Sequence, residues 1–310
     1  MDPVITPRIV FMGTPDFAVA SLEALVAAGF TIVGVVTAPD KPAGRGLQVQ
    51  ESAVKKFAIA NQIPVLQPVK LKDPAFLAAL AAWNPDLQVV VAFRMLPEVV
   101  WNKPRLGTIN LHGSLLPQFR GAAPINWALI EGEEHTGVTT FLLKQEIDTG
   151  DILRSASLPI TAADNFGTLY DKLKVVGAKV LVETVERYCK GELVPQPQPN
   201  STTPLKEAPK IQKETGKIDW KKPALVIQNL IRGLSPHPGA YTFLEGKMFK
   251  IFLSTIESTI PDVEPGTLQT DGKSFLKFAC TDGWLRAEEI QLEGKKRMPI
   301  AAFLAGYRFA

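Results

Sequence analysis

The first half of the chain alternates short apolar runs with segments whose apolar residues recur at helical spacing. The runs predict strands at 8–12, 31–37, 87–92, 108–112 and 136–143. The spaced segments, bounded in several places by Asp or Gly, predict helices at 16–28, 52–60, 74–83, 123–131 and 166–190. Because strands separated by helices form parallel sheets covered on both faces, we expect an α/β domain with an open, mostly parallel sheet.

A proline-rich segment divides the chain. Residues 195–204 contain four prolines, a composition typical of an extended linker. Beyond it, strand-like runs at 239–244, 249–253, 275–279 and 285–292 are separated by turn signals and flanked by helices at 223–231 and 300–304. This pattern predicts a small C-terminal β-barrel of about five strands. We therefore expect domains at 1–194 and 209–310, joined by a linker at 195–208.

The composition is that of a globular protein, with 310 residues of which 46% are hydrophobic. No uncharged apolar run reaches the roughly 20 residues of a membrane-spanning helix, and the segment before the first strand is too short for a signal peptide. Cys189 and Cys280 lie far apart and form no CxxC motif, which favours a reducing, cytoplasmic compartment. We expect no membrane contact and a monomer.

The charges are unevenly distributed although the net charge is only +3. Residues 1–204 carry 18 basic and 19 acidic side chains, whereas residues 205–310 carry 16 basic and 12 acidic ones. A mildly basic second half would attract a polyanion such as a nucleic acid. A solvated surface explains the same excess almost as well, so both interpretations stay open.

Two familiar kinds of site do not match the sequence. The turn after the first strand contains one glycine, Gly13, where a dinucleotide-binding fingerprint needs three. The three histidines, His112, His135 and His237, include no pair at the helical spacing of metal ligands. Neither a nicotinamide cofactor nor a metal is therefore expected.

The strand at 108–112 carries candidate chemistry. Asn110 and His112 share one of its faces, and the chain then turns at the carboxyl end, where open parallel sheets bind ligands. A carboxamide beside an imidazole suits acyl transfer, because the amide can stabilise an oxyanion while the imidazole moves a proton. Asp148 arrives at the same edge if the strand at 136–143 is a neighbour, and it would then fix the ring orientation. A purely structural role for all three residues remains an alternative.

Three segments resemble the folate-dependent formyltransferases. They are Asn110-Leu-His-Gly-Ser-Leu-Leu-Pro117, Phe119-Arg-Gly-Ala-Ala-Pro-Ile125 and Ile147-Asp-Thr-Gly-Asp-Ile152. Residues 10–18, 38–46, 229–236 and 292–299 are also similar to that family, so the resemblance covers nearly the whole chain. It implies a Rossmann-like formyltransferase domain followed by an OB-like barrel.

The resemblance also implies a reaction: transfer of the formyl group of 10-formyltetrahydrofolate to the α-amino group of methionine on initiator methionyl-tRNA, in translation initiation and without a metal. The implied catalytic residues are Asn110, His112 and Asp148. The implied folate contacts are Ser114, Leu115, Leu116, Pro117 and Phe93. The implied tRNA contacts are Lys41, Arg45, Lys206, Lys210 and Lys213.

Other functions stay open at this point. The same catalytic core could act on a small amine, such as an amino sugar or glycinamide ribonucleotide, or could hydrolyse a folate. The chain could also be a non-catalytic RNA-binding module. The second half of the chain favours a large substrate, and the intact set of Asn110, His112 and Asp148 favours an enzyme.

Overall fold

The computed structural model describes residues 7–43, 48–200 and 203–309, and the chain forms two compact units. Unit 1 comprises Met1–Arg120, Gly137–Leu158 and Tyr170–Lys206. Unit 2 comprises Gly121–Thr136, Pro159–Leu169 and Glu207–Ala310. The sequence domains 1–194 and 209–310 stay a prediction.

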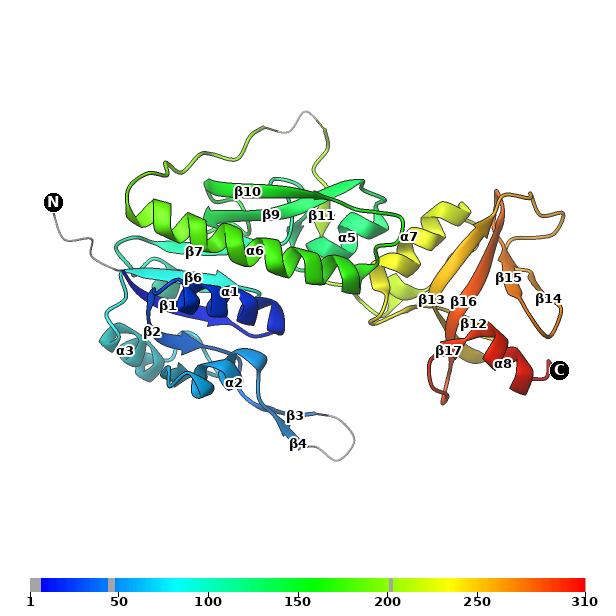
Figure 1. Cartoon of the computed structure of the whole chain (residues 1–310), viewed down its shortest axis with the longest axis horizontal. Helices are drawn as coiled ribbons and strands as arrows, with labels where there is room; N and C mark the ends of the chain where they lie inside the picture. Colours follow the sequence, from blue (N-terminus) through cyan, green and yellow to red (C-terminus); the bar gives the residue numbers. More distant parts are fainter. Residues whose placement is uncertain (1–6, 44–47, 201–202, 310) are drawn as a thin grey trace. The chain divides into compact units, whose positions relative to one another are not determined.

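A seven-stranded sheet forms the centre of unit 1, in the order β10-β9-β7-β6-β1-β2-β5 (Figure 1). Its strands are β1 (Arg8–Gly13), β2 (Thr31–Val36), β5 (Val65–Leu66), β6 (Leu87–Val91), β7 (Thr108–His112), β9 (His135–Leu142) and β10 (Ile152–Pro159). The strands from β7 to β5 are parallel, whereas β9 is antiparallel to β7. The predicted open, mostly parallel sheet is confirmed.

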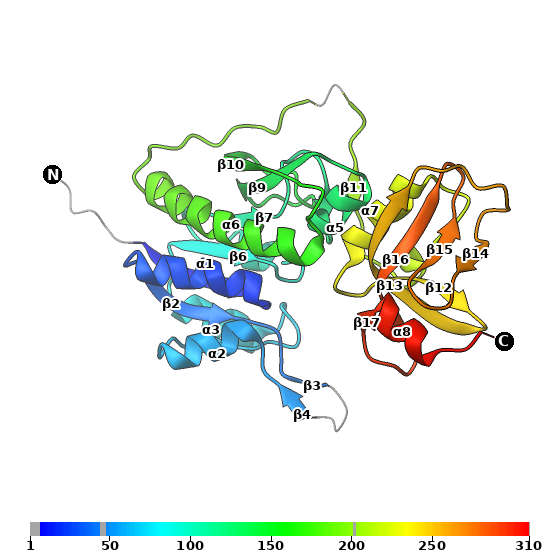
Figure 2. The ribbon, with the colours of Figure 1, turned by 45° about the vertical axis from the view of Figure 1, so that its right-hand side comes forward.

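Helices cover both faces of this sheet. The helices of unit 1 are α1 (Asp16–Ala27), α2 (Ala53–Ala60), α3 (Pro74–Ala82), α4 (Glu98–Trp101) and most of α6 (Phe166–Cys189). Helices α1 and α6 lie side by side on one face (Figure 2). Helix α6 packs closely against β7 there, since a Cβ added at Gly177 would lie 3.0 Å from Leu111 Cδ2. Helices α3 and α4 pack on the other face against Val10, Met12 and Val90. Because strand side chains alternate, Asn110 and His112 point away from α6.

Local sequence signals explain where several of these elements begin and end. Ser52 caps α2 by accepting a hydrogen bond from the Lys55 amide, and Asp73 caps α3 in the same way, with Pro74 in its first turn. At the end of β1, a Cβ on Gly13 would lie 2.6 Å from Ala18 Cβ and 2.9 Å from Val91 O. Only glycine fits this turn without displacing its neighbours.

Unit 2 is built on an antiparallel sheet in the order β12-β13-β16-β15-β14, with β17 paired to β16. Its strands are β12 (Ala240–Leu244), β13 (Lys247–Glu257), β14 (Leu268–Thr270), β15 (Leu276–Ala279), β16 (Trp284–Leu292) and β17 (Met298–Pro299). The sheet encloses a core with Phe249, Ile290 and Phe303. Glu245 and Gly246, at φ values of 48° and 77°, form the predicted turn between β12 and β13. The small C-terminal β-barrel of the prediction is confirmed in class, with β14 and β17 as additional short strands.

Helices also lie in the described part of unit 2, and several elements of the chain were not predicted: β5, α4 and β10, given above, and the short elements given next. The helices are α5 (Pro124–Ile130), α7 (Ala224–Leu234) and α8 (Ile300–Gly306). The short elements are β3 (Lys41–Ala43), β4 (Gln48–Gln50), β8 (Arg120–Gly121), β11 (Glu207–Ala208) and the 3₁₀ turn η1 (Glu214–Gly216). Within the described ranges, no helix is long and apolar enough to cross a membrane.

Candidate active site

Strand β7 places Asn110 and His112 on one face of the larger sheet. The imidazole of His112 is buried, with 7% of the residue exposed, and Asn110 is half-buried. Among the residues that the structure describes, none hydrogen-bonds to the Asn110 carboxamide. Asn110 therefore offers an uncommitted amide donor two residues from a buried imidazole.

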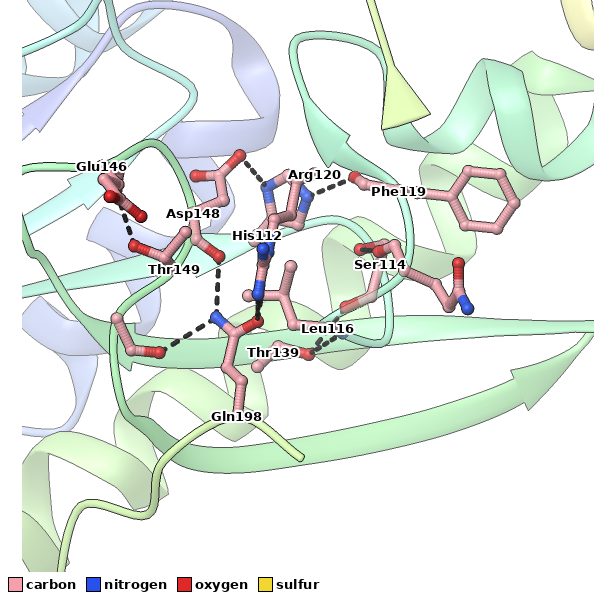
Figure 3. A network of polar contacts seen from close by, with 12 residues as sticks. His112, Ser114, Leu116, Phe119, Arg120, Thr139, Glu146, Asp148, Thr149 and Gln198 are labelled. Atoms are coloured by element: carbon pink, nitrogen blue, oxygen red, sulfur yellow. Dashed lines mark hydrogen bonds and ion pairs between the residues drawn. The ribbon is translucent and has the colours of Figure 1, made fainter. Parts of the chain in front are cut away.

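Two oxygen atoms face the ring of His112 (Figure 3). Its Nε2 lies 2.9 Å from the Phe119 carbonyl oxygen, and its Nδ1 lies 3.7 Å from Asp148 Oδ2. Since a carbonyl can only accept, Nε2 carries a hydrogen and donates it to Phe119. The distance between Nδ1 and Asp148 Oδ2 exceeds that of a hydrogen bond, so in this conformation the carboxylate faces the ring nitrogen without bonding to it.

Asp148 reaches His112 by a different route from the predicted one. The adjacency of the two strands is as expected, but β9 is antiparallel to β7 and ends with Leu142 opposite Ile109, at the far end of β7 from His112. Asp148 does lie beside His112 as expected, but the expected route is wrong, because β9 ends at the opposite end of β7. The loop after β9 brings Asp148 back instead, and it is packed so tightly that a Cβ on Gly150 would lie 1.6 Å from Leu142 O.

Thr139 of β9 holds the loop that follows His112. Its hydroxyl donates to the Ser114 carbonyl at 2.7 Å and accepts from the Leu116 amide at 3.1 Å. The Ser114 hydroxyl donates to the Gln118 carbonyl at 2.7 Å. Ser114 and Leu116 are buried, whereas Leu115 and Pro117 are half-buried. The loop is therefore fixed by internal bonds, and the folate contacts predicted for 114–117 stay a prediction.

Phe93 lies just beyond β6, at the carboxyl edge of the parallel strands. Its half-buried ring packs against the core cluster that includes Val90 and Leu96, and the Arg94 guanidinium lies 5.6 Å from the ring centroid. Arg94 also donates to the Val69 carbonyl at 2.8 Å. The ring is thus held in place at the edge where open parallel sheets bind ligands.

Gln198 is a residue of the site that no pattern in the sequence predicts. Its amide nitrogen donates to the carbonyl oxygens of Asp148 at 2.7 Å and Gly150 at 3.0 Å, and its amide oxygen accepts from Arg120 Nη2 at 2.5 Å (Figure 3). A proline-rich linker pattern predicts extended chain but not what that chain contacts. The Phe119 carbonyl and Arg120, in contrast, stand within a segment that the resemblance had already marked.

The predicted tRNA-binding cations are separated between the units. Lys41 begins β3 and is exposed, and Arg45 lies outside the described residues. Lys206 belongs to unit 1, whereas Lys210 and Lys213 belong to unit 2, and all three are exposed. Over the described part of the chain, no group of three or more His, Cys, Asp or Glu side chains could hold a metal ion.

Comparison with known proteins identifies the family. The family model described as formyl transferase matches residues 7–185, and the model described as formyl transferase, C-terminal domain, matches residues 210–308. The chain belongs to the formyl transferase family. The resemblance stated from its motifs is confirmed.

The similar full-length proteins define a narrower group. The chain is 51% identical over 307 residues to the methionyl-tRNA formyltransferase of Bacteroides fragilis, covering 97% of this chain and 95% of that protein. It is 54% identical over 310 residues to the methionyl-tRNA formyltransferase of Azobacteroides pseudotrichonymphae, covering 96% and 95%.

A solved structure shares the fold at lower identity. The sugar 3N-formyl transferase WlaRD, crystallised in the presence of dTDP and 5-N-formyl-THF, matches with a TM-score of 0.68 at 19% identity. The match covers 94% of this chain and 99% of that one. This likeness supports the fold alone.

Proposed function

We propose that this chain transfers the formyl group of 10-formyltetrahydrofolate to the α-amino group of methionine on initiator methionyl-tRNA. The observation that carries the proposal is the site itself: the Asn110 carboxamide, which bonds to none of the described residues, stands beside a buried His112 that faces Asp148. The full-length methionyl-tRNA formyltransferases that match the chain at about half identity support the choice of substrate.

The residues present fit a folate formyl donor. When bound, the folate supplies an activated formyl carbon, and an amine can attack that carbon without a metal. Asn110 donates its amide hydrogen to the formyl oxygen, where negative charge develops during attack. In the half-buried setting of the site, this hydrogen bond gains strength as the charge grows.

In this mechanism His112 accepts the proton of the attacking amine. Its Nε2 is committed to the Phe119 carbonyl, so Nδ1 is the ring atom that takes the proton released by the attacking amine. The new bond joins the amine nitrogen to the formyl carbon. The bond between that carbon and the folate nitrogen would then break, and the folate nitrogen would take up the proton as tetrahydrofolate leaves. The Asp148 carboxylate, 3.7 Å away, stabilises the positive charge that the ring then carries. Asp148 thereby also favours the ring orientation in which Nδ1 faces its carboxylate and Nε2 faces the Phe119 carbonyl.

The same proposal extends to binding. We expect the folate to lie along residues 114–117 and Phe93, with initiator tRNA phosphates on Lys41, Arg45, Lys206, Lys210 and Lys213. Such cations contribute affinity and salt dependence rather than sequence preference. A cytoplasmic location and a monomeric state also stay predictions.

The test mixes the protein with 10-formyltetrahydrofolate and either charged initiator or charged elongator methionyl-tRNA. We expect formylmethionine only on the initiator tRNA. Formyl transfer to an amino sugar or glycinamide ribonucleotide, with none to either tRNA, would contradict the proposal.

The substitution His112→Ala tests the mechanism. It removes the group that takes the proton, and we expect kcat to fall about 10²–10⁴-fold while tRNA binding is retained. A variant that formylates at the normal rate would refute the role given to His112.

A further inference from the structure

The linker segment lies along both loops that face His112. Gln196 forms a β-bridge with Ile152, directly after the Asp148 loop. Further along, the Lys206 carbonyl accepts from the Phe119 amide at 2.7 Å, and the Lys206 amide donates to Gln118 Oε1 at 2.8 Å. The linker is therefore bonded to the two loops whose oxygen atoms contact the imidazole.

Gln198 joins these two loops through one side chain. Its two donor hydrogens go to carbonyls of the Asp148 loop, and its acceptor oxygen takes bonds from Arg120 Nε at 3.2 Å and Nη2 at 2.5 Å. Arg120 directly follows Phe119. A carboxamide is suited to this position because it donates and accepts at the same time, which a carboxylate or a hydrocarbon cannot do.

The residues that face the imidazole need such support. Asp148 has a φ of 54° and Phe119 a φ of 58°, a left-handed conformation that is uncommon for residues other than glycine. Residues hold this conformation where the surrounding structure fixes their backbone groups. The linker bonds the Asp148 carbonyl through Gln198 and the Phe119 amide through the Lys206 carbonyl.

We propose that Gln198 is a positioning residue for formyl transfer. It fixes the backbone of Asp148 and Gly150 against Arg120, and so keeps the Asp148 carboxylate facing Nδ1 of His112. It acts through Asp148 and touches no substrate. This inference rests on the proposed function, and it adds that the linker, besides connecting the two halves of the sequence, completes the active site.

Two substitutions and a control test the proposal. Gln198→Met removes all of the hydrogen bonds, and Gln198→Glu keeps the acceptor for Arg120 but loses both donors to the Asp148 loop. Gln196→Met is the matched control, because among the described residues the exposed Gln196 side chain bonds only to the Val194 carbonyl. We expect both Gln198 variants to lose about 10–100-fold in kcat per folded molecule, with KM for folate and tRNA unchanged. The control should behave as the unsubstituted protein.

Hydrogen exchange provides a readout that does not depend on catalysis. Exchange of the backbone amides of residues 146–151 should rise in both Gln198 variants and stay unchanged in Gln196→Met. An unsubstituted protein that formylates no tRNA would refute the proposed function, while the exchange result would still test the linker contact. Unchanged kcat or unchanged exchange in the Gln198 variants would overturn the inference. A raised KM with normal kcat would also overturn it, because Gln198 would then bind substrate.

Discussion

At the residue scale, Asn110 stands out because its side chain makes no hydrogen bond within the described structure. Its carboxamide bonds to none of the described residues, so removing it leaves no partner unsatisfied. We expect Asn110→Ala to lower kcat about 10²–10³-fold, as for the loss of one oxyanion donor, with little change in thermal stability. Asn102→Ala, at an exposed helix end, is the control. A large fall in melting temperature with unchanged kcat would show that Asn110 is structural.

Asp86 gives a residue-scale prediction for stability and pH. The Arg8 amide, which donates at 2.9 Å, together with the Arg105 side chain, holds the pKa of Asp86 below its ordinary value despite partial burial. Because the folded pKa is depressed, this stabilisation is present above the unfolded pKa of about 3.9 and is lost as pH falls through the folded value. We expect Asp86→Ala to lower the free energy of unfolding by about 1–2 kcal/mol at pH 7.

The measurement for Asp86 is urea unfolding of both proteins between pH 7 and pH 3. The difference between them should stay constant at neutral pH and shrink below about pH 4. A difference that grows toward low pH would have the wrong sign for this explanation.

At the scale of elements, β9 holds the loop after β7 through one hydroxyl. Thr139→Val keeps the shape of the side chain but leaves the Ser114 carbonyl and the Leu116 amide without their shared partner. We expect a loss of about 1–3 kcal/mol in the free energy of unfolding, since buried polar groups lose their bonds, and a lower kcat as the loop shifts. Thr31→Val, at the exposed start of β2, is the control. Equal effects of the two substitutions would contradict this account.

The elements themselves were largely predictable, because they depend on local pattern. The caps at Ser52 and Asp73 and the turn at Glu245 and Gly246 are visible in the sequence. Strand direction is not local: nothing in residues 136–143 shows that β9 runs antiparallel to β7. The path by which Asp148 reaches His112 was mispredicted for this reason.

The residues of the candidate site also differ in how far the sequence predicts their positions. Asn110 and His112 share a face because strand side chains alternate, which the sequence states directly. Gln198 lies in a segment without apolar periodicity, 50 residues from Asp148 in the chain. Its contact with Asp148 depends on the linker folding back onto the Asp148 loop. The contact between them follows from tertiary structure, which no pattern of hydrophobic residues in the linker encodes.

At the scale of the whole molecule, the units do not follow the order of the sequence. Helix α5 falls within the residues matched by the first family model, yet it belongs to unit 2, where Asn126 Nδ2 donates to the Gly233 carbonyl of α7 at 2.7 Å. A Cβ on Gly233 would lie 2.5 Å from Ile130 Cγ1, so the two helices pack in close contact. The C-terminal sheet is thus stabilised in part by a helix that follows the loop after His112 in the chain.

The distribution of charge leads to the last prediction. Residues 205–310 carry 16 basic and 12 acidic side chains, and Lys210 and Lys213 stand exposed near the start of this region. If both bind tRNA phosphates, replacing them with Ala removes two cation contacts. Each contact contributes about 0.7–0.9 to the slope of log affinity against log salt, so the slope should become shallower by about 1.5.

The measurement is tRNA binding over a range of salt concentrations, with kcat determined at saturating tRNA. The double variant should bind tRNA more weakly at low salt. Its kcat should stay unchanged, because neither lysine takes part in the catalytic step assigned to Asn110 and His112. A control with Lys103→Ala and Lys179→Ala removes the same charge from exposed positions in unit 1. If the two double variants change the slope equally, the effect belongs to net charge and not to contacts at Lys210 and Lys213.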